Sequence, residues 1–178
     1  MTTVLKLFGV LIAAFVVTGL IIPNHIDIRR SIEIDAPIHI IHNQVNDLNN
    51  WSSWSPWIEM DPSIETTLGD IKTGVGAHQS WRGQSGAGQL TFTAESEQEG
   101  VEYDMSFDGD STPYKAGLSY QAKGNKTLVT WYMTGNMQPI IIGNYFALIM
   151  DALVGDSFVI GLEKLKEVSE KANTMPVG

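Results

Sequence analysis

The chain of 178 residues is long enough for one domain with a substantial core, and its lack of cysteine excludes disulfides, thiolate metal sites and cysteine nucleophiles. Beyond residue 26 there are 10 basic and 20 acidic side chains, which give this part of the chain a net charge of −10. A field of that sign repels a phosphate backbone, so we expect no nucleic-acid partner.

The first 25 residues differ in composition from the rest of the chain. Residues 4–22 are uncharged apart from Lys6 and are mostly apolar. They nearly supply the about 20 apolar residues that cross a bilayer, while the Lys6 amine can reach the headgroups. A cleaved signal peptide has a similar composition, but no small-x-small cleavage site precedes Pro23. We therefore expect an uncleaved transmembrane anchor over residues 1–25, in contact with the membrane through residues 4–22.

Basic residues flank this segment on both sides. Lys6 precedes most of the apolar run, and Arg29 and Arg30 follow it. The two arginines fall within an expected strand, so Lys6 decides the orientation. We expect a single-pass membrane protein whose one domain, residues 26–178, lies outside the cytoplasm.

The domain begins with a strand and a short helix. Residues 28–34 alternate in polarity, which predicts a strand, and Pro37 suits the first turn of a helix. Apolar residues at helical spacing follow at Ile38, Ile41, Val45 and Leu48. Three tryptophans then stand close together, at positions 51, 54 and 57.

Residues 63–137 indicate repeated strands separated by glycine, asparagine and aspartate turns. Their alternation predicts an antiparallel sheet with one face in water. In residues 89–95 the alternation places Leu90, Phe92 and Ala94 on one face and Glu95 on the other. The same rule places Val129, Trp131 and Met133 together, facing the terminal helix.

The last part of the chain changes to a helical period. Phe158, Leu162, Leu165 and Val168 form an apolar stripe opposite charged residues. Residues 140–154 are almost wholly apolar, but Gly143-Asn144 and Asp151 interrupt them, so this stretch is too short to cross a bilayer. The order of elements predicts an α+β fold in which a curved antiparallel sheet wraps around the long terminal helix.

Several segments resemble the SRPBCC superfamily, which includes plant pathogenesis-related allergens, START lipid-transfer domains and polyketide cyclase/dehydrase-like proteins. The resemblance covers residues 28–172 and is closest to bacterial cyclase/dehydrase-like members with an N-terminal membrane segment. The matching segments are residues 32–37, 45–48 with 51–57, 74–77, 81–83, 86–88, 129–135 and 161–166. The resemblance implies a helix-grip fold, preceded here by one transmembrane helix, and a cavity for an apolar ligand.

Aromatic, methionine and leucine side chains are candidates for the lining of that cavity, because apolar pockets use such residues with few polar groups. The alternative is an ordinary core. The candidates are Trp54, Trp81, Phe92, Tyr103, Met105, Tyr120, Trp131, Met133, Phe158 and Leu162.

Other motifs give no chemistry of their own. His39 and His42 have metal-ligand spacing, but no third ligand is near in the sequence, so we expect no metal. Gly74-x-Gly76 and Gly86-x-Gly88 lack the lysine and helix of a phosphate loop and indicate turns. The polar strand residues His78, Arg82, Glu95, Tyr103 and Asp104 have no spacing typical of a triad or dyad, so we assign no catalytic residue and no cofactor.

Three functions fit these observations. The first is a non-enzymatic module that holds an apolar or amphipathic small molecule, such as a lipid, in an internal cavity at a membrane. The second is a cyclase, dehydrase or hydrolase that uses the same cavity. The third is a structural or assembly partner with a filled core. A buried acid or histidine in the cavity would favour the enzyme, a cavity without ionisable groups the carrier, and a packed interior the assembly partner.

Overall fold

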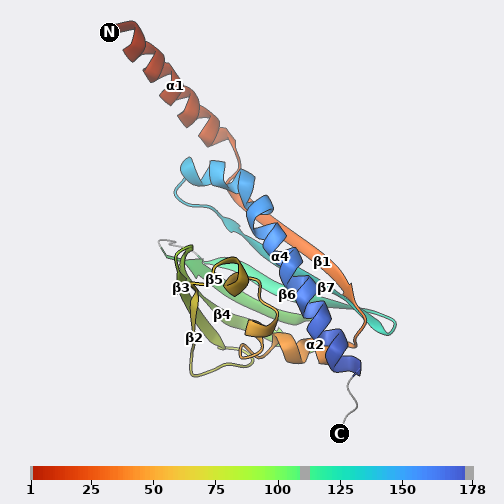
Figure 1. Cartoon of the computed structure of the whole chain (residues 1–178). Coiled ribbons are helices and arrows are strands. Elements are labelled where there is room, and N and C mark those ends of the chain that lie inside the picture. Colours follow the sequence, from red (N-terminus) through yellow and green to blue (C-terminus); the bar gives the residue numbers. More distant parts are fainter. Residues whose placement is uncertain (1, 109–112, 175–178) are drawn as a thin grey trace.

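The computed structural model describes residues 2–108 and 113–174 (Figure 1). An N-terminal helix precedes a sheet and three short helical segments, and a long helix is the last described element. The elements are α1 (Thr2–Ile21), β1 (His25–Ile34), α2 (Ile38–Val45), η1 (Trp51–Ser53), α3 (Trp57–Met60), β2 (Glu65–Leu68), β3 (His78–Gly83), β4 (Gly86–Ser96), β5 (Gly100–Phe107), β6 (Tyr114–Lys123), β7 (Lys126–Asn136) and α4 (Ile142–Thr174).

The strands form one sheet of seven in the order β1-β7-β6-β5-β4-β3-β2, and every neighbouring pair is antiparallel. Only β1 leaves the sequential order, because it closes against β7 at the edge where α4 lies. The helix α4 packs along β1 and crosses the concave side of the sheet (Figure 1). The α+β class and the curved antiparallel sheet around a long C-terminal helix are confirmed.

The strand β7 presents the face that its alternation predicts. Val129, Trp131 and Met133 are buried, with at most 1% of each residue exposed. The helix comes closest at Gly161, where a Cβ atom would lie only 2.5 Å from the Trp131 ring. A glycine is therefore required at this crossing, because a larger residue would push the helix away from the indole.

The helix α4 is longer than the sequence indicated, because it joins residues 142–154 and 158–171 into one element of 33 residues. The expected interruptions are contact points instead. Asn144 donates hydrogen bonds to α1, and Asp151 pairs with Arg30 of β1. Gly155 lets the Arg30 guanidinium lie against the helix, since a Cβ atom there would overlap a guanidinium nitrogen.

One face assignment on β4 was wrong. A β-bulge shifts the β4–β5 register between Phe92 and Ala94, so that Phe92 faces Tyr103 but Glu95 faces Val101. Phe92, Tyr103 and Val101 are all buried, whereas Ala94 is exposed. The extra residue of the bulge thus turns Glu95 to the inner face and Ala94 to the outer one.

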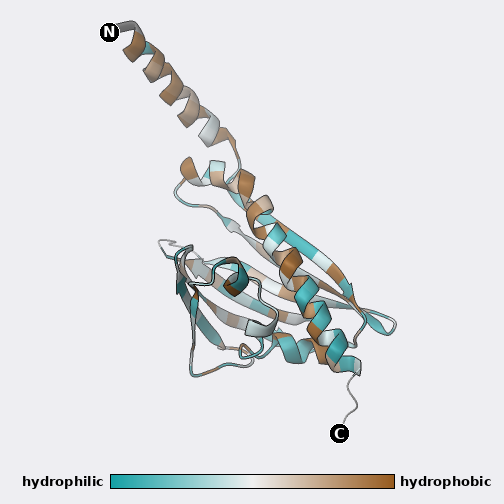
Figure 2. Ribbon diagram, viewed as in Figure 1, coloured by the Kyte–Doolittle hydropathy of each residue, from teal (hydrophilic) through white to brown (hydrophobic). Residues whose placement is uncertain are grey.

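Within the described residues, two helices are long and apolar enough to cross a membrane by length and composition, α1 and α4. A signal sequence or a core helix has the same properties. The side chains of α1 are almost all exposed, whereas α4 buries one side on the sheet. Apolar residues dominate α1 and the first turns of α4, and charged residues appear in the rest of α4 (Figure 2).

Candidate functional site

Aromatic rings fill the space between the sheet and α4. The Trp131 ring stacks on Phe158. It also meets the Trp54 ring edge-on, with the two ring centroids 5.4 Å apart. On the other side of Trp54, Trp51 contacts Phe92 and Tyr103 at centroid distances of 5.9 and 5.8 Å. These side chains are therefore in mutual contact and form much of the core.

The polar atoms of these rings are paired. The indole of Trp131 donates to the Tyr103 hydroxyl at 2.8 Å, and those of Trp51 and Trp54 donate to the α2 carbonyls of Val45 and Gln44. The three-residue helix η1 and the C-terminal turn of α2 are fixed to each other by these bonds. Burial raises the pKa of Tyr103, which keeps its hydroxyl protonated.

The structure brings the ten predicted lining residues to the inner side of the sheet. Seven of them are buried: Trp54, Phe92, Tyr103, Trp131, Met133, Phe158 and Leu162. Trp81, Met105 and Tyr120 are partly buried against the same core. Trp81 lies over Gly88 and meets Phe107 edge-on at 5.9 Å, at the β3 side. The internal cavity itself stays a prediction.

A polar cluster borders this interior where α2 covers β4 and β6. His42 Nε2 lies 2.8 Å from Glu95 Oε1, and only 7% of the His42 side chain is exposed. The Tyr120 ring meets the His42 ring at a right angle, with centroids 6.0 Å apart. Three elements distant in sequence therefore place a histidine, a carboxylate and a phenol together.

Two atoms of this cluster are buried without a hydrogen-bond partner among the described residues: His42 Nδ1 and the Tyr120 hydroxyl. In the tautomer that donates from Nε2 to the Glu95 carboxylate, His42 Nδ1 is an acceptor. Burial, and next the charge of Glu95, raise the pKa of Tyr120, so its hydroxyl is a donor at neutral pH. The cluster thus offers one free donor and one free acceptor.

The local sequence explains two of the three positions. His42 follows Ile38 by one helical turn and precedes Val45 by three residues, so it belongs to the buried stripe of α2. Tyr120 follows Leu118 on the inner face of β6. The sequence singles out His42 only as a possible metal ligand and Glu95 only as an isolated polar strand residue. Their contact could not be predicted, because the bulge reverses the expected face of Glu95.

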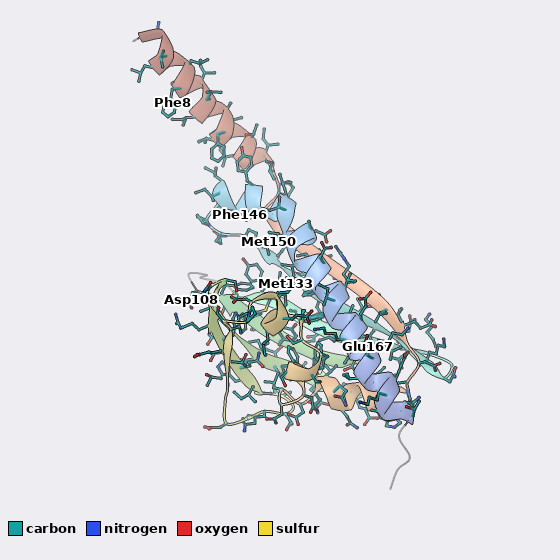
Figure 3. All side chains as sticks on the ribbon, viewed as in Figure 1. Phe8, Asp108, Met133, Phe146, Met150 and Glu167 are labelled. Atoms are coloured by element: carbon teal, nitrogen blue, oxygen red, sulfur yellow. The ribbon has the colours of Figure 1, made fainter. Side chains whose placement is uncertain are left out.

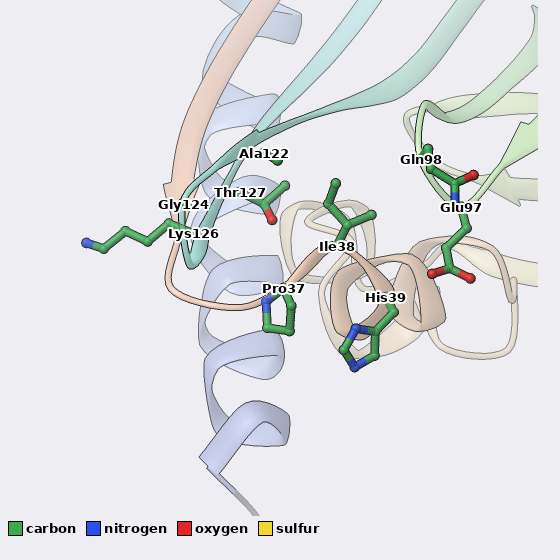
Figure 4. Close-up of a pocket in the computed structure, with 9 residues that line it drawn as sticks. All are labelled: Pro37, Ile38, His39, Glu97, Gln98, Ala122, Gly124, Lys126 and Thr127. Carbon is green, nitrogen blue, oxygen red and sulfur yellow. The ribbon is translucent and has the colours of Figure 1, made fainter.

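An open groove of about 290 Å³ lies at the start of α2. It is bounded by the start of α2, the β4–β5 turn and the β6–β7 turn (Figure 4), and its lining includes Ile38, Glu97, Ala122 and Thr127. Ile38 is one turn from His42, and Ala122 is two residues from Tyr120 on β6. The groove and the cluster are therefore built on the same elements.

The remaining polar candidates are dispersed. His78 Nδ1 lies 2.9 Å from the Thr91 hydroxyl, Asp104 pairs with Lys115, and the exposed Arg82 lies 3.7 Å from Asp108. His39 is exposed on the rim of the groove. Within the described ranges, no three histidine or acidic side chains gather in a way that could hold a metal ion.

Comparisons with known proteins define the class. The family model described as polyketide cyclase/dehydrase and lipid transport matches residues 25–170. The chain belongs to this family, within the SRPBCC superfamily. Comparison with curated proteins gives no significant match.

Solved structures share the fold at low sequence identity. The protein TTHA0849 from Thermus thermophilus has a TM-score of 0.63 at 15% identity, with 83% of this chain and 99% of that one covered. Ara h 8.0201 has a TM-score of 0.51 at 11% identity, with coverages of 79% and 98%. DynU16, a protein in the dynemicin biosynthetic locus, has a TM-score of 0.59 at 14% identity. The match covers 83% of this chain and 48% of DynU16. At such identities the likeness shows the fold alone.

Proposed function

We propose that the domain binds a small apolar molecule that carries a hydroxyl or carbonyl group, and that α1 holds the domain at a membrane. The observation that carries this proposal is the pair of unpartnered atoms, His42 Nδ1 and the Tyr120 hydroxyl, beside an apolar interior. A buried polar atom without a partner costs about 1–3 kcal/mol. A ligand hydroxyl between the two atoms would donate to His42 and accept from Tyr120, which removes both costs.

The groove is the route to this position. Its volume of about 290 Å³ is at the lower end of small-molecule sites. Ile38 points into the space between α2 and the sheet (Figure 4), one helical turn before His42, and we place the passage at its side chain. Apolar area buried there contributes about 25 cal/mol per Å², less the cost of ordering the ligand. None of the ten predicted lining residues borders the groove itself; the proposed apolar wall is the interior that they form beyond it.

The membrane part of the proposal rests on α1. Its apolar side chains are exposed from Val4 to Ile21, and Gly19 is the only buried residue among residues 4–21. Exposure of this extent in water is unfavourable, whereas a bilayer covers it. The family description includes lipid transport, which supports a role at lipid. We place the domain outside the cytoplasm, as Lys6 predicts.

A second candidate function is catalysis by the same cluster, and the contact between Glu95 and His42 favours it. A carboxylate that orients a histidine is the usual arrangement of a general base. His42 Nδ1 would take a proton from carbon next to a substrate carbonyl, and the Tyr120 hydroxyl would donate a hydrogen bond to the carbonyl oxygen. This is chemistry of the cyclase and dehydrase kind that the family description names.

Probe titration of the full-length protein in detergent tests the binding proposal. The probe is 2-naphthol, an apolar ring with one hydroxyl. The variant Tyr120→Phe removes the donor, and we expect about fivefold weaker binding, from the loss of one hydrogen bond. The matched control is Tyr132→Phe on the outer face of the sheet, where binding should be unchanged.

Equal affinities of the two variants, or no binding of 2-naphthol to the unmodified protein, would overturn the proposal. Mass spectrometry of small molecules that co-purify with the protein gives an independent measurement. A protein that carries none and binds no probe is the outcome expected of an assembly partner with a filled core.

A further inference from the structure

The first turns of α4 are apolar on more than one side and lie beside the start of β1 and the end of α1 (Figure 1). Ile142, Phe146 and Ile149 form one exposed stripe at helical spacing, each about half exposed. Leu148, on another side of the helix, is 63% exposed, and Ile140 before the helix is 58% exposed. We call residues 140–150 the α4 tip.

Specific bonds fix the α4 tip to α1. The Asn144 amide donates to the carbonyl of Gly19, in the last turn of α1, at 2.8 Å, and to that of Ile22, just after the helix, at 2.7 Å. These carbonyls are among those that lack partners at a helix end, and in hydrocarbon they would have no water to bind. The buried Asn144 therefore supplies hydrogen-bond donors to carbonyls at the end of α1, which an apolar medium could not do.

A second set of contacts lies one turn deeper along α1. The Tyr145 ring stacks on Phe15 with centroids 4.5 Å apart, and its hydroxyl donates to the Phe15 carbonyl at 2.7 Å. Ile141 packs on Gly19, where a Cβ would lie 2.7 Å from its methyl group. Phe15 precedes Ile22 by seven residues, or about 10 Å of helix. The α4 tip therefore lies at the level of the last 10 Å or so of α1.

The uncharged surface of the α4 tip ends where charged residues begin on α4 and on the neighbouring strand β1. Asp151 is the first charged residue of α4, and its carboxylate lies 3.0 Å from the Arg30 guanidinium of β1. Beside it on β1, Arg29 pairs with Asp27. The tip is uncharged from its start to this boundary (Figures 2 and 3, with Phe146 and Met150 labelled in Figure 3).

We propose that the α4 tip is embedded in lipid, in the same leaflet as the C-terminal turns of α1. The occupant of its exposed surface is acyl chain, because the surface is continuous with that of α1 and is uncharged. The nine helical residues Ile142–Met150 span about 13 Å, against about 30 Å of hydrocarbon, so the tip enters one leaflet and does not cross. This inference rests on the proposed anchoring by α1.

The lack of cysteine makes the test direct, because single cysteines can be introduced into the full-length protein without competing thiols. The variants are Phe146→Cys and Ile149→Cys in the tip, Val10→Cys in α1, and Glu163→Cys on the exposed side of α4. Each is spin-labelled and reconstituted in phosphatidylcholine vesicles with phosphatidylglycerol. Collisions with oxygen report lipid, and collisions with a water-soluble nickel chelate report water.

We expect labels at positions 146 and 149 to resemble that at position 10, with collision rates with oxygen several-fold above those with nickel. The label at position 163 should show the reverse. Nickel access at 146 and 149 with oxygen preference at 10 would overturn the inference and leave the anchor in place. Nickel access at position 10 would overturn the proposed anchoring instead.

Protection of positions 146 and 149 from both reagents would identify a protein partner on this surface and would also overturn the inference. Circular dichroism of each labelled variant, compared with the unmodified protein, confirms that the fold is retained. All four positions are exposed, so the substitutions leave the core intact.

Discussion

Phe158 of α4 lies flat against Trp131 of β7, with ring centroids 4.4 Å apart and planes inclined by 4°. The same indole donates a hydrogen bond to Tyr103 on β5. The longest helix and the centre of the sheet are thus joined through one side chain, which contacts ligand-lining candidates on both sides.

Trp131→Ala should lower the free energy of unfolding by about 3–5 kcal/mol, the range for an aromatic residue removed from a packed core. Chemical denaturation of the full-length protein in detergent measures this. Trp131→Phe is the matched control, because it keeps a ring on Phe158 while it loses the hydrogen bond to Tyr103 and part of the indole's volume. A smaller loss for the alanine variant, with a tryptophan fluorescence response to an apolar probe in the unmodified protein, would indicate that Trp131 lines a cavity.

Gly161→Ala should destabilise the protein by about 1–3 kcal/mol, although alanine is the better helix former. The added methyl group would lie 2.5 Å from the Trp131 ring and 3.0 Å from Pro56. Gly9→Ala in α1, where a Cβ meets nothing within 4 Å, is the control and should leave the unfolding midpoint unchanged. Equal midpoints for the two variants would contradict this account of the crossing.

Glu95→Ala should cost about 1–3 kcal/mol of stability, because it leaves both ring nitrogens of His42 buried without a partner. Glu97→Ala removes an exposed carboxylate two residues further along and should be neutral within about 0.5 kcal/mol. Thermal unfolding of both variants at pH 7 compares them. An equal effect would mean that the His42–Glu95 contact contributes nothing to the fold.

Asp61 should make stability depend on pH. Hydrogen bonds from the Ser63 and Ser85 hydroxyls, and from their backbone amides, hold the pKa of Asp61 well below its usual range. A lowered folded-state pKa gives stability that is present above the unfolded pKa of about 3.9 and lost as pH falls towards the folded value. Asp61→Asn should therefore unfold at a lower urea concentration than the unmodified protein at pH 7. The difference between the two urea midpoints should be smaller at pH 3.

Asp70→Asn, at an exposed aspartate, is the control for this measurement. If the midpoints of Asp61→Asn and the unmodified protein differ equally at pH 7 and pH 3, the hydrogen bonds to Asp61 do not depend on the charge of its carboxylate.

The sequence predicts the features that depend on regular periodicity. The inner face of β7 and the buried face of the second half of α4 both follow from spacing alone, since each element is regular there. Glu95 escapes the rule because one residue inserted opposite β5 reverses the alternation, and the β4 sequence does not reveal it. The start of α4 could not be predicted for a related reason. In the sequence Asn144 indicates a break in the helix, whereas in the structure it binds carbonyls at the end of α1.

The length of β1 sets how far the groove stands from the end of α1. Only Ile22, Pro23 and Asn24 separate α1 from β1, whose ten residues extend about 33 Å before Pro37 at the groove. Asn144 and Tyr145 of α4 donate hydrogen bonds to the Ile22 and Phe15 carbonyls at this junction. With α1 across a bilayer, the groove would stand about 30 Å from the lipid surface. Its ligand would then come from water or from a soluble carrier, and not directly from the bilayer.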